Sequence, residues 1–472
     1  MRVVFGCGIS GLAAAQLLQA KNESVILTDD KMPSPETLAK FQANQLVFIP
    51  FSHLSPCETY VEIIVSPGVD FRHPWIANAK AKGVAITSEI TLALRYYTGS
   101  ILSVTGTNGK STTVMMMAHI LRKEGFSVKA AGNIGVPLSL VVQETPPPKV
   151  IVLELSSYQL HWSAPIPSQV ALFCNFSYDH MGQHQTEKNY FLAKCKIFES
   201  PYPNFVGIIT SEIQTLAKKW GVHLFPSVRN PQQAKRASGI PLDRRRCPDG
   251  RDGLGMTESA SPLTMDSSPV LQVIHPDTIS PQNLKEAHIL EPHNQKNALY
   301  AATACAIFLQ KSTALLLQHL QNFAYLPHRF ERIGKVHNAL VINDSKSTTV
   351  ASTLCALESA PGPCMLFLGG VGKNEPFSPL LAYKEKIITL YTFGTTGPQI
   401  AQDLSVCNPI ACTTLKEALR TCFAHPLPTE GTILFSPGCA SLDEFSHFEA
   451  RGDFFIAAIQ PFLTERKERT AS

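Results

Sequence analysis

A glycine-rich stretch, GTNGKST at residues 106–112, has the residue types that bind a nucleoside triphosphate. The ammonium group of Lys110 can reach the β- and γ-phosphates, and the hydroxyl of Ser111 can hold Mg²⁺. The generic loop G-x-x-x-x-G-K-[ST] has a glycine where this chain has Val104. A structural turn alone does not require Gly-Lys-Ser-Thr between an apolar strand pattern and the helical stretch VMMMAHIL. We therefore predict a nucleoside triphosphate site here despite Val104.

A second glycine turn, GCGISG, follows the first strand pattern of the chain. Gly6, Gly8 and Gly11 would let the backbone approach a pyrophosphate, and the helix that follows offers free N–H donors. Asp29 and Asp30 end the next strand pattern, at the spacing where an acid meets a ribose hydroxyl. This turn by itself suggests NAD or FAD, and a nucleotide-binding oxidoreductase is the corresponding alternative function. A structural turn without a ligand is the simpler alternative.

Three further side chains could take part in chemistry at the triphosphate site. Glu154 ends the strand pattern VIVLE, where a carboxylate lies beside the nucleotide in open α/β sheets and can coordinate Mg²⁺. A favourable interaction with a helix dipole is the alternative role for it. His180 also follows a strand pattern and is a candidate second metal ligand. Lys194, in YFLAKCKIFES, has the spacing of an ordinary surface lysine.

The elements that must position these residues alternate between strand and helix patterns. Strands are predicted at 2–6, 24–29, 61–69, 149–157, 168–177, 339–345, 364–370, 387–394 and 432–438. This alternation predicts an α/β fold of parallel sheets with helices on their faces. Domain boundaries are predicted near residues 98–99 and 323–334.

The stretch from about 229 to 269 differs in character from the rest of the chain. It is rich in Pro, Gly, Ser and Arg and has no sustained apolar period, so we predict a long surface excursion. Its RRR run is interpreted as a solvated charge cluster, with an anion site as the alternative.

Length and composition exclude several classes of protein. At 472 residues the chain exceeds one hydrophobic core, and about 150 residues per domain gives three domains. A formal net charge of +4 without a dense basic stripe argues against a nucleic-acid partner. No apolar run reaches the ~20 residues of a membrane span, and residues 1–10 show no signal-peptide pattern. The 12 cysteines, without a C-x-x-C pair, predict reduced thiols in a cytoplasmic protein.

Taken together, these stretches resemble the Mur ligase family of bacterial cell-wall enzymes. GTNGKST is similar to that family's form of the ATP loop, in which the first glycine of the generic loop is not required. The further motifs that match, in order, are GNIG, LELSSYQL, DHM, AKCKIFE, HNQKNA, LPHRFE, INDSKST and SPGCASLDEFSHFEARG. They cover nearly the whole chain outside residues 229–269, so the series is far more specific than either glycine turn alone.

The resemblance implies three α/β domains, each with a mainly parallel sheet flanked by helices. Residues 1–97 would form a Rossmann-like domain that holds the UDP part of a substrate. Residues 98–325 would form a P-loop-type ATP domain that carries the excursion at about 229–269. Residues 326–472 would form a second Rossmann-like domain that binds an amino acid.

The resemblance also implies an ATP-dependent amide ligase of peptidoglycan precursor synthesis, acting as a cytoplasmic monomer. Its substrates would be ATP, UDP-N-acetylmuramoyl-L-alanine and D-glutamate. ATP would phosphorylate the alanyl carboxylate, because phosphate leaves more readily than a carboxylate oxygen. The amine of D-glutamate would then attack the acyl phosphate, giving a tetrahedral intermediate. The Asp-Asn-Pro-Arg type motif expected of relatives that add diaminopimelate or lysine is absent. A non-catalytic scaffold gated by nucleotide is a further alternative.

The resemblance assigns roles to the residues that match the family's motifs. The implied cofactors are two Mg²⁺ ions, and their ligands would be Ser111, Glu154, His180 and a carbamate formed on Lys194 from CO₂. The implied catalytic residues are Lys110, Glu154, His180 and Lys194. The implied ATP contacts are Gly106, Thr107, Asn108, Gly109, Lys110, Ser111, Thr112, Asn294, Asn297, Arg329 and Asp344. The implied contacts with the UDP substrate are Ile9, Ser10, Asp29, Asp30, Lys31, Gly68, Asn133 and His180. The implied D-glutamate contacts are Lys346, Thr348, Lys373, Ser441, Leu442 and Phe448.

Two departures from the family pattern concern binding. Lys31 stands in place of an arginine at the UDP contact, which weakens bidentate recognition. The sequence GQHQT after DHM differs from the family pattern, so the loop there is expected to differ.

Overall fold

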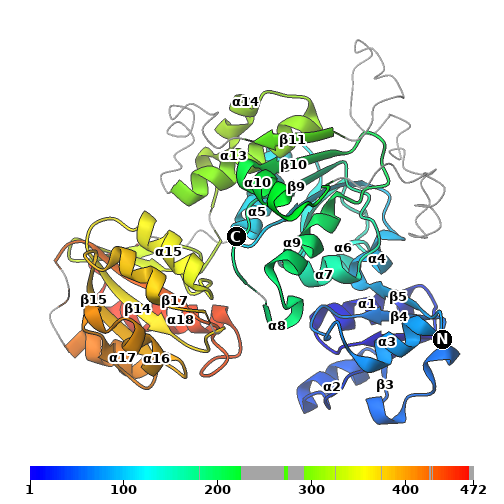
Figure 1. Cartoon of the computed structure of the whole chain (residues 1–472), viewed down its shortest axis with the longest axis horizontal. Coiled ribbons are helices and arrows are strands. Elements are labelled where there is room, and N and C mark those ends of the chain that lie inside the picture. Colours follow the sequence, from blue (N-terminus) through cyan, green and yellow to red (C-terminus); the bar gives the residue numbers. More distant parts are fainter. Residues whose placement is uncertain are drawn as a thin grey trace. The chain divides into compact units, whose positions relative to one another are not determined.

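The computed structural model describes residues 1–179, 181–224, 270–274, 292–324, 326–373, 375–424, 427 and 429–466, with 270–274 described as backbone. The predicted excursion at 229–269 and His180 lie outside the described residues. The chain divides into two compact units, Met1–Leu290 with Asn294–Gln321 and Glu291–His293 with Asn322–Ser472 (Figure 1).

The first sheet is entirely parallel, with the strand order β3-β2-β1-β4-β5. Its strands are β1 (Arg2–Phe5), β2 (Val25–Thr28), β3 (Val47–Phe48), β4 (Glu62–Val65) and β5 (Ala85–Ser88). Its helices are α1 (Ile9–Ala20), α2 (Pro35–Ala43), α3 (Pro74–Ala81) and α4 (Glu89–Leu94), with short turns η1 (Phe51–His53) and η2 (Cys57–Thr59). The strand order reverses between β1 and β4, which places the ends of these strands at a switch point where ligands bind in such sheets.

The second sheet is also parallel, with the order β11-β10-β9-β6-β8-β7. Its strands are β6 (Ser100–Thr105), β7 (Val128–Gly132), β8 (Val150–Glu154), β9 (Val170–Phe173), β10 (Val206–Thr210) and β11 (Val270–Ile274). Its helices are α5 (Lys110–Lys123), α6 (Leu138–Val141), α7 (Ser157–Trp162), α8 (Met181–His184), α9 (Glu187–Cys195), η3 (Lys196–Phe198), α10 (Ser211–Trp220), α13 (Pro292–Leu309), α14 (Thr313–Leu317) and η6 (Gln318–Asn322). The strand VIVLE is buried throughout because helices cover both faces of a parallel sheet.

One hydrophobic core joins the first two sheets. On the first sheet, Val3 and Phe5 point into a separate core, whereas Val4 between them belongs to the shared one. Side chains from α1, α4, α6 and β8 complete the shared core, among them Leu17, Leu92, Leu138 and Leu153. Burial of these side chains, at roughly 25 cal/mol per Å² of apolar surface, holds the two sheets in one unit.

The second unit contains a seven-stranded sheet with the order β16-β15-β14-β17-β13-β12-β18. Its strands are β12 (Glu331–Val336), β13 (Ala339–Asn343), β14 (Cys364–Gly369), β15 (Ile387–Phe393), β16 (Ile410–Ala411), β17 (Thr432–Gly438) and β18 (Glu465–Arg466). Its helices are α15 (Val350–Ser359), η7 (Ser378–Tyr383), α16 (Gly397–Asp403), η8 (Ser405–Cys407), α17 (Leu415–Ala424), α18 (Phe448–Ile459) and η9 (Gln460–Phe462). β12 pairs antiparallel with both neighbours, and the other pairings are parallel. Helices α15 and α16 pack on one face, and α17 and α18 pack on the other.

The predicted fold class is confirmed. Three mainly parallel sheets are flanked by helices, as the strand–helix alternation of the sequence indicated. β1 ends directly before Gly6, β2 ends directly before Asp29, and β8 ends at Glu154, whereas β4 ends at Val65, three residues before Gly68. The carboxyl ends of parallel strands meet at one edge of their sheet.

Candidate active site

The predicted ATP loop lies between the end of β6 and the start of α5. Gly109 has a φ of 73° and precedes Lys110, the first residue of α5. A Cβ atom on Gly109 would come within 2.4 Å of the Asn297 Oδ1 atom. The loop therefore needs glycine at this position for two reasons, the left-handed backbone and the close approach of α13.

A residue that the sequence did not single out, Asn175, fixes the shape of this loop. Its Oδ1 atom accepts hydrogen bonds from the backbone N–H groups of Thr107 (3.1 Å) and Asn108 (2.9 Å). Its Nδ2 atom donates to the Asn108 carbonyl oxygen at 2.9 Å. Asn175 follows β9, so the loop is held by the neighbouring strand rather than by its own sequence. A lone asparagine after a strand has no spacing signature that would have revealed this role.

The cation and hydroxyl groups of the loop lie at the N-terminus of α5. Lys110 donates from Nζ to the Thr107 carbonyl oxygen at 2.8 Å, so its side chain folds back over the loop. Ser111 and Thr112 are buried in the first turn of the helix. The N–H groups at the start of α5, the helix dipole and an ammonium group together suit a polyphosphate.

The structure also brings the predicted asparagines of α13 to this loop. Thr113 Oγ1 donates to Asn297 Oδ1 at 3.4 Å, and Asn297 Nδ2 donates to Asn294 Oδ1 at 3.4 Å. Both asparagines are buried. They place two polar side chains of α13 beside the first turn of α5.

Glu154 and Asn133, predicted from different motifs, are hydrogen-bonded to each other. Asn133 Nδ2 donates to Glu154 Oε1 at 2.8 Å, and the Asn133 backbone N–H donates to the Glu154 carbonyl oxygen at 3.0 Å. Glu154 is 1% exposed, and its Oε2 atom is buried without a hydrogen-bond partner. A buried carboxylate oxygen without a partner is costly unless a cation or a ligand donor meets it.

Lys194 is buried, in contrast to the surface position that its spacing alone suggested. It is 1% exposed, and its Nζ atom donates to the Gly106 carbonyl oxygen at 2.6 Å. The same atom lies 4.6 Å from the centre of the Tyr190 ring. Burial, together with the charge of Lys110, holds the pKa of Lys194 well below its ordinary value. The neutral amine is therefore more accessible here than on an exposed lysine.

His180 lies outside the described residues, but its neighbours are described. Asp179 is buried, and it favours the charged form of Lys194. His184 Nε2 lies 2.9 Å from Ser157 Oγ, and burial lowers the pKa of this histidine to about 4. His184 is thus a neutral hydrogen-bonding group near neutral pH. Among the described residues, no three His, Cys, Asp or Glu side chains gather into a metal-binding group.

The N-terminal glycine turn has the close contacts that require glycine. A Cβ atom on Gly11 would lie 1.9 Å from the Gly6 carbonyl oxygen, which also accepts a hydrogen bond from Ser66 Oγ at 2.8 Å. The Cys7 N–H donates to Asp29 Oδ2 at 2.8 Å. The carboxyl ends of β1, β2 and β4 are thereby joined around this turn.

Several predicted UDP contacts are exposed at these strand ends. Ile9 is 77% exposed at the start of α1, which is unusual for a large apolar side chain. Asp30 Oδ1 lies 3.1 Å from His73 Nε2, a residue that the sequence did not single out. The other predicted contacts of this turn are Ser10, Lys31 and Gly68, with Lys31 exposed.

The remaining candidates belong to the second unit. Asp344 follows β13 and accepts hydrogen bonds from Ser436 Oγ (2.8 Å) and the Phe330 N–H (3.0 Å). Burial raises the pKa of Asp344 to about 6, and the charge of Arg329 opposes this shift. The charge of Arg329 therefore favours the ionised form of Asp344.

Five of the predicted D-glutamate contacts lie on loops that follow β13, β14 and β17, and the sixth, Phe448, is the first residue of α18. Lys346 Nζ lies 3.8 Å from the centre of the Phe448 ring, which brings two of the predicted residues together. Ser441 is buried and Leu442 is 71% exposed. The other two predicted contacts are Lys373, which is exposed, and Thr348, which is half-buried. Arg451, not predicted, is buried and donates to the Ser345 carbonyl oxygen at 2.8 Å and to Ser345 Oγ at 3.1 Å.

Two family models match the first unit. A model described as the N-terminal domain of Mur ligase MurD-like proteins matches residues 1–88. A model described as the Mur ligase middle domain matches residues 104–305. Each match contains one of the two glycine turns.

Relatives match almost the whole chain. A protein of Bacillus cereus (strain AH820) named UDP-N-acetylmuramoylalanine--D-glutamate ligase is 31% identical over 468 residues, covering 98% of this chain and 97% of the relative. A protein of the same name from Bacillus anthracis (strain A0248) matches to the same extent. Among solved structures, UDP-N-acetylmuramate-alanine ligase MurC of Thermotoga maritima superposes with a TM-score of 0.54 at 16% identity, covering 98% of this chain and 99% of that one.

MurF ligase of Thermotoga maritima in complex with ADP gives a TM-score of 0.53 at 14% identity, covering 85% of this chain and 95% of that one. These two structures support the fold, and the sequence identity to the Bacillus proteins supports the relationship. Membership decides against the oxidoreductase that the N-terminal turn alone suggested. The chain belongs to the Mur ligase family of ATP-dependent amide-bond ligases.

Proposed function

We propose that this chain joins D-glutamate to UDP-N-acetylmuramoyl-L-alanine, using ATP, in peptidoglycan precursor synthesis. The observation that carries the proposal is the 31% identity over 98% of the chain to proteins named for that reaction. The geometry supports it, because one compact unit contains two glycine turns of different chemistry. The turn at Gly106–Thr112 has a lysine followed directly by a serine for a triphosphate, whereas the turn at Gly6–Gly11 has no lysine.

The ATP end of the reaction is assigned to the loop before α5. Lys110 and the N–H groups of the first turn would bind the phosphates and stabilise charge on the transferring phosphoryl group. Asn294 and Asn297 would contact the adenine side. Arg329 and Asp344 of the second unit would contact ATP, the latter at the ribose. The remaining contacts proposed for this loop are Gly106, Thr107, Asn108, Gly109, Ser111 and Thr112.

The residues of the first unit fit a magnesium site. Ser111 and Glu154 offer the hard oxygen donors that Mg²⁺ prefers, and the Oε2 atom of Glu154 is buried without a partner. We propose that they bind the ion associated with the ATP phosphates, and that His180 and Lys194 serve a second ion. When bound, these ions would neutralise charge on the phosphoryl oxygens.

Lys194 is proposed to serve as a carbamate. An ammonium group cannot bind a cation, but the neutral amine can react with CO₂ to give an anion with two oxygen donors. The depressed pKa of Lys194 supports this proposal, because it favours the neutral amine. Burial would also protect the carbamate from water.

The acceptor is proposed to extend from the N-terminal turn toward Glu154. Ile9, Ser10 and the strand-end residues Asp29–Lys31 would bind the UDP part, together with Gly68. Asn133, bonded to Glu154, would lie near the alanyl carboxylate, with His180 on the same substrate. ATP would convert that carboxylate into an acyl phosphate. The amine of D-glutamate would then displace phosphate through a tetrahedral intermediate.

D-glutamate is assigned to the second unit. Its two carboxylates require cations, which Lys346 and Lys373 supply. The other proposed contacts are Thr348, Ser441, Leu442 and Phe448. Lys346 already lies over the Phe448 ring, so the aromatic face would help orient its ammonium group.

We further propose that the enzyme acts as a cytoplasmic monomer. The eleven described cysteines are free thiols, which suits a reducing compartment. Within the described part of the chain, no helix has the length and apolar character needed to cross a membrane.

The test is phosphate release from ATP by the purified protein with Mg²⁺ and UDP-N-acetylmuramoyl-L-alanine. We expect release only when D-glutamate is also present, and none from the Lys110→Ala variant. L-glutamate, meso-diaminopimelate and L-lysine are run as alternative amines, and preferred turnover with any of them would overturn the assignment. Release without an acceptor or an amine would contradict the ligase mechanism. Ligand-gated closure without any phosphate release would instead support a nucleotide-gated scaffold.

A further inference from the structure

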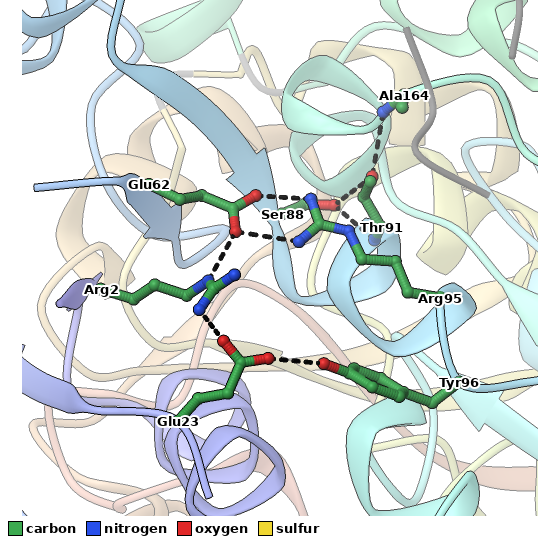
Figure 2. Close-up of polar contacts among 8 residues, drawn as sticks. All are labelled: Arg2, Glu23, Glu62, Ser88, Thr91, Arg95, Tyr96 and Ala164. Atoms are coloured by element: carbon green, nitrogen blue, oxygen red, sulfur yellow. Dashed lines mark hydrogen bonds and ion pairs between the residues drawn. The ribbon is translucent and has the colours of Figure 1, made fainter. Parts of the chain in front are cut away.

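Helix α4 is anchored at both ends, to the first sheet and to the second. At its start, Ser88 Oγ lies 2.9 Å from Ser163 Oγ, and the Ala164 N–H donates to Thr91 Oγ1 at 2.9 Å. At its end, Arg95 donates to both carboxylate oxygens of Glu62 on β4, at 2.9 and 2.5 Å. Figure 2 shows the Glu62 carboxylate between the guanidinium groups of Arg95 and Arg2. Every residue of α4 is buried.

Figure 2 also shows how this network extends away from the helix. Arg2 forms an ion pair with Glu23, and Glu23 accepts a hydrogen bond from Tyr96 at 2.9 Å. Burial raises the pKa of Glu62, but the bonds and charges of Arg95 and Arg2 outweigh it and leave this pKa below its ordinary value. Glu62 is thus a charged carboxylate compensated by two guanidinium groups, and it holds the end of α4 in place.

Glu89, the first residue of α4, is a buried carboxylate with far less compensation. It is 2% exposed, and its Oε1 atom accepts a hydrogen bond from the Ser139 N–H at 2.5 Å. Burial raises the pKa of Glu89 to about 7, although hydrogen bonding by Ser139 opposes the shift. A carboxylate in the first turn of a helix interacts favourably with the helix dipole. An exposed carboxylate would make the same interaction without the cost of burial.

Ser139 belongs to the segment that also contains Asn133. This segment runs from the end of β7 into α6 and is closed by a hydrogen bond from the Gly132 N–H to the Val136 carbonyl oxygen at 3.3 Å. At its beginning, Asn133 is bonded to Glu154 through both its backbone and its side chain. At its end, Ser139 is bonded to Glu89. The segment is therefore held between one carboxylate of the second sheet and one carboxylate of α4.

We propose that Glu89 is a positioning residue for the acceptor substrate, and that its bond to Ser139 fixes the segment that presents Asn133 beside Glu154. The inference rests on the proposed function, in which Asn133 lies near the alanyl carboxylate. On this proposal, α4 fixes the position of the Asn133 segment relative to the glycine turn of the first sheet, which would bind the UDP part. The acceptor oxygen of Glu89, rather than its charge, performs this task.

Three substitutions separate the oxygen from the charge. Glu89→Gln keeps an acceptor oxygen and removes the charge, so the KM for UDP-N-acetylmuramoyl-L-alanine should stay within about twofold of the wild-type value. Glu89→Asp keeps the charge but is one methylene too short, and Glu89→Ala removes the acceptor. Both should raise that KM about tenfold or more, because small misplacements near the reacting atoms are costly. The KM for ATP should change less than about twofold in all three.

A pH series distinguishes the buried carboxylate from an ordinary surface one. Because the folded-state pKa of Glu89 is raised, the stability gained from its neutral form is present below the unfolded-state pKa of about 4.3. That stability is lost as the pH rises through about 7. Glu89→Gln should therefore melt at a higher temperature than the wild type at pH 8 and at nearly the same temperature at pH 4. Glu144→Gln is the matched control, since Glu144 follows α6 and forms an ion pair with Lys129 at the surface. This substitution should change neither the melting temperature nor the KM for the acceptor.

The outcomes separate this inference from the proposed function. A wild-type protein without D-glutamate-dependent phosphate release would refute the function itself. An active wild type whose Asp variant keeps the acceptor KM would refute the positioning role. If the Asp and Ala variants do not fold, the Gln variant decides, because a tenfold loss of acceptor affinity in that variant would show that the charge is required. Equal increases in both KM values would indicate a general structural effect and also overturn the proposal.

Discussion

At the scale of single residues, Lys194 shows how strongly the surroundings decide what a side chain can do. Its helical spacing predicted a surface lysine, and only the family resemblance assigned it a chemical role. In the structure it is buried against the Gly106 carbonyl and the Tyr190 ring. Tyr190 lies one turn earlier on α9, but Gly106 lies 88 residues away in the sequence, so neither the burial nor the lowered pKa could be derived from local sequence.

Replacing Lys194 tests the proposed carbamate. Lys194→Ala should lower kcat by about 10²–10³-fold or more, because a group that stabilises the phosphoryl transfer is lost. Acetate should restore part of the activity, since a short carboxylate can occupy the vacated space. The measurement is phosphate release with and without acetate. Full activity of the variant would refute the carbamate.

Lys196→Ala provides the matched control two residues away. Lys196 is also largely buried, and it donates to the carbonyl oxygens of His161 (2.8 Å) and Ser163 (3.2 Å). Its loss should lower the melting temperature, and acetate should have no effect on its activity. Equal rescue of both variants would show that acetate acts elsewhere.

Gly109 supports a second prediction at this scale. Gly109→Ala should raise the KM for ATP about tenfold or more, because a Cβ atom 2.4 Å from Asn297 Oδ1 must displace α13 or the loop. Gly125→Ala is the control, because Gly125 has a φ of 84° and open space around its Cβ position. Gly125→Ala should lower the free energy of unfolding by about 1–2 kcal/mol, because alanine is strained in a left-handed backbone conformation, and should leave the KM for ATP unchanged. Similar KM values for the two variants would disprove the role of the close contact.

At the scale of elements, the ATP loop is a strand-to-helix turn whose shape is set from outside. Asn175 accepts from two of its N–H groups and donates to one of its carbonyls. Asn175→Ala would remove these three side-chain hydrogen bonds, each worth about 0.5–1.5 kcal/mol, whereas the backbone carbonyl of residue 175 would still accept from the Thr107 N–H. The KM for ATP should rise about tenfold, measured by initial rates of phosphate release.

Asn44→Ala is the control for this substitution. Asn44 follows α2 and donates from Nδ2 to the Lys40 carbonyl oxygen at 2.7 Å, in the first sheet's part of the chain. Its loss should lower stability slightly and leave the ATP KM unchanged. If Asn175→Ala also leaves the KM for ATP unchanged, the loop does not depend on the Asn175 side chain for its shape.

The same elements show what could be predicted from sequence. The two glycine turns and the carboxylate at the end of β8 were identified because strand, turn residue and helix follow one another along the chain. β12 was not among the predicted strands, since its sequence ERIGKV buries only every third residue. Asn175, His73 and Glu89 were also missed. Each acts through a partner more than 40 residues away, and no spacing within the sequence encodes such a contact.

At the scale of the whole molecule, the stretch at about 229–269 remains a prediction, because it lies outside the described residues. The described chain stops at Leu224 and continues at Val270 in β11, which pairs with β10. We expect deletion of residues 232–262 to leave folding and turnover largely intact, because the stretch is poor in apolar residues and loop length affects stability only weakly. Soluble yield, melting temperature and phosphate release are the measurements. Loss of soluble protein would show that the stretch contributes to the core.

The hydrophobic core that joins the first two sheets limits how this protein can be recombined with its relatives. A chimaera made at residue 97 would separate the sheets at a convenient point of the sequence. It would also combine Leu17 and Leu92 from one parent with Leu138 and Leu153 from the other, inside a single packed interior. Interiors packed at crystal density tolerate such mixing poorly. The exchangeable module is therefore the entire first unit, and a change of UDP-substrate specificity is better attempted by editing the exposed ends of β1, β2 and β4.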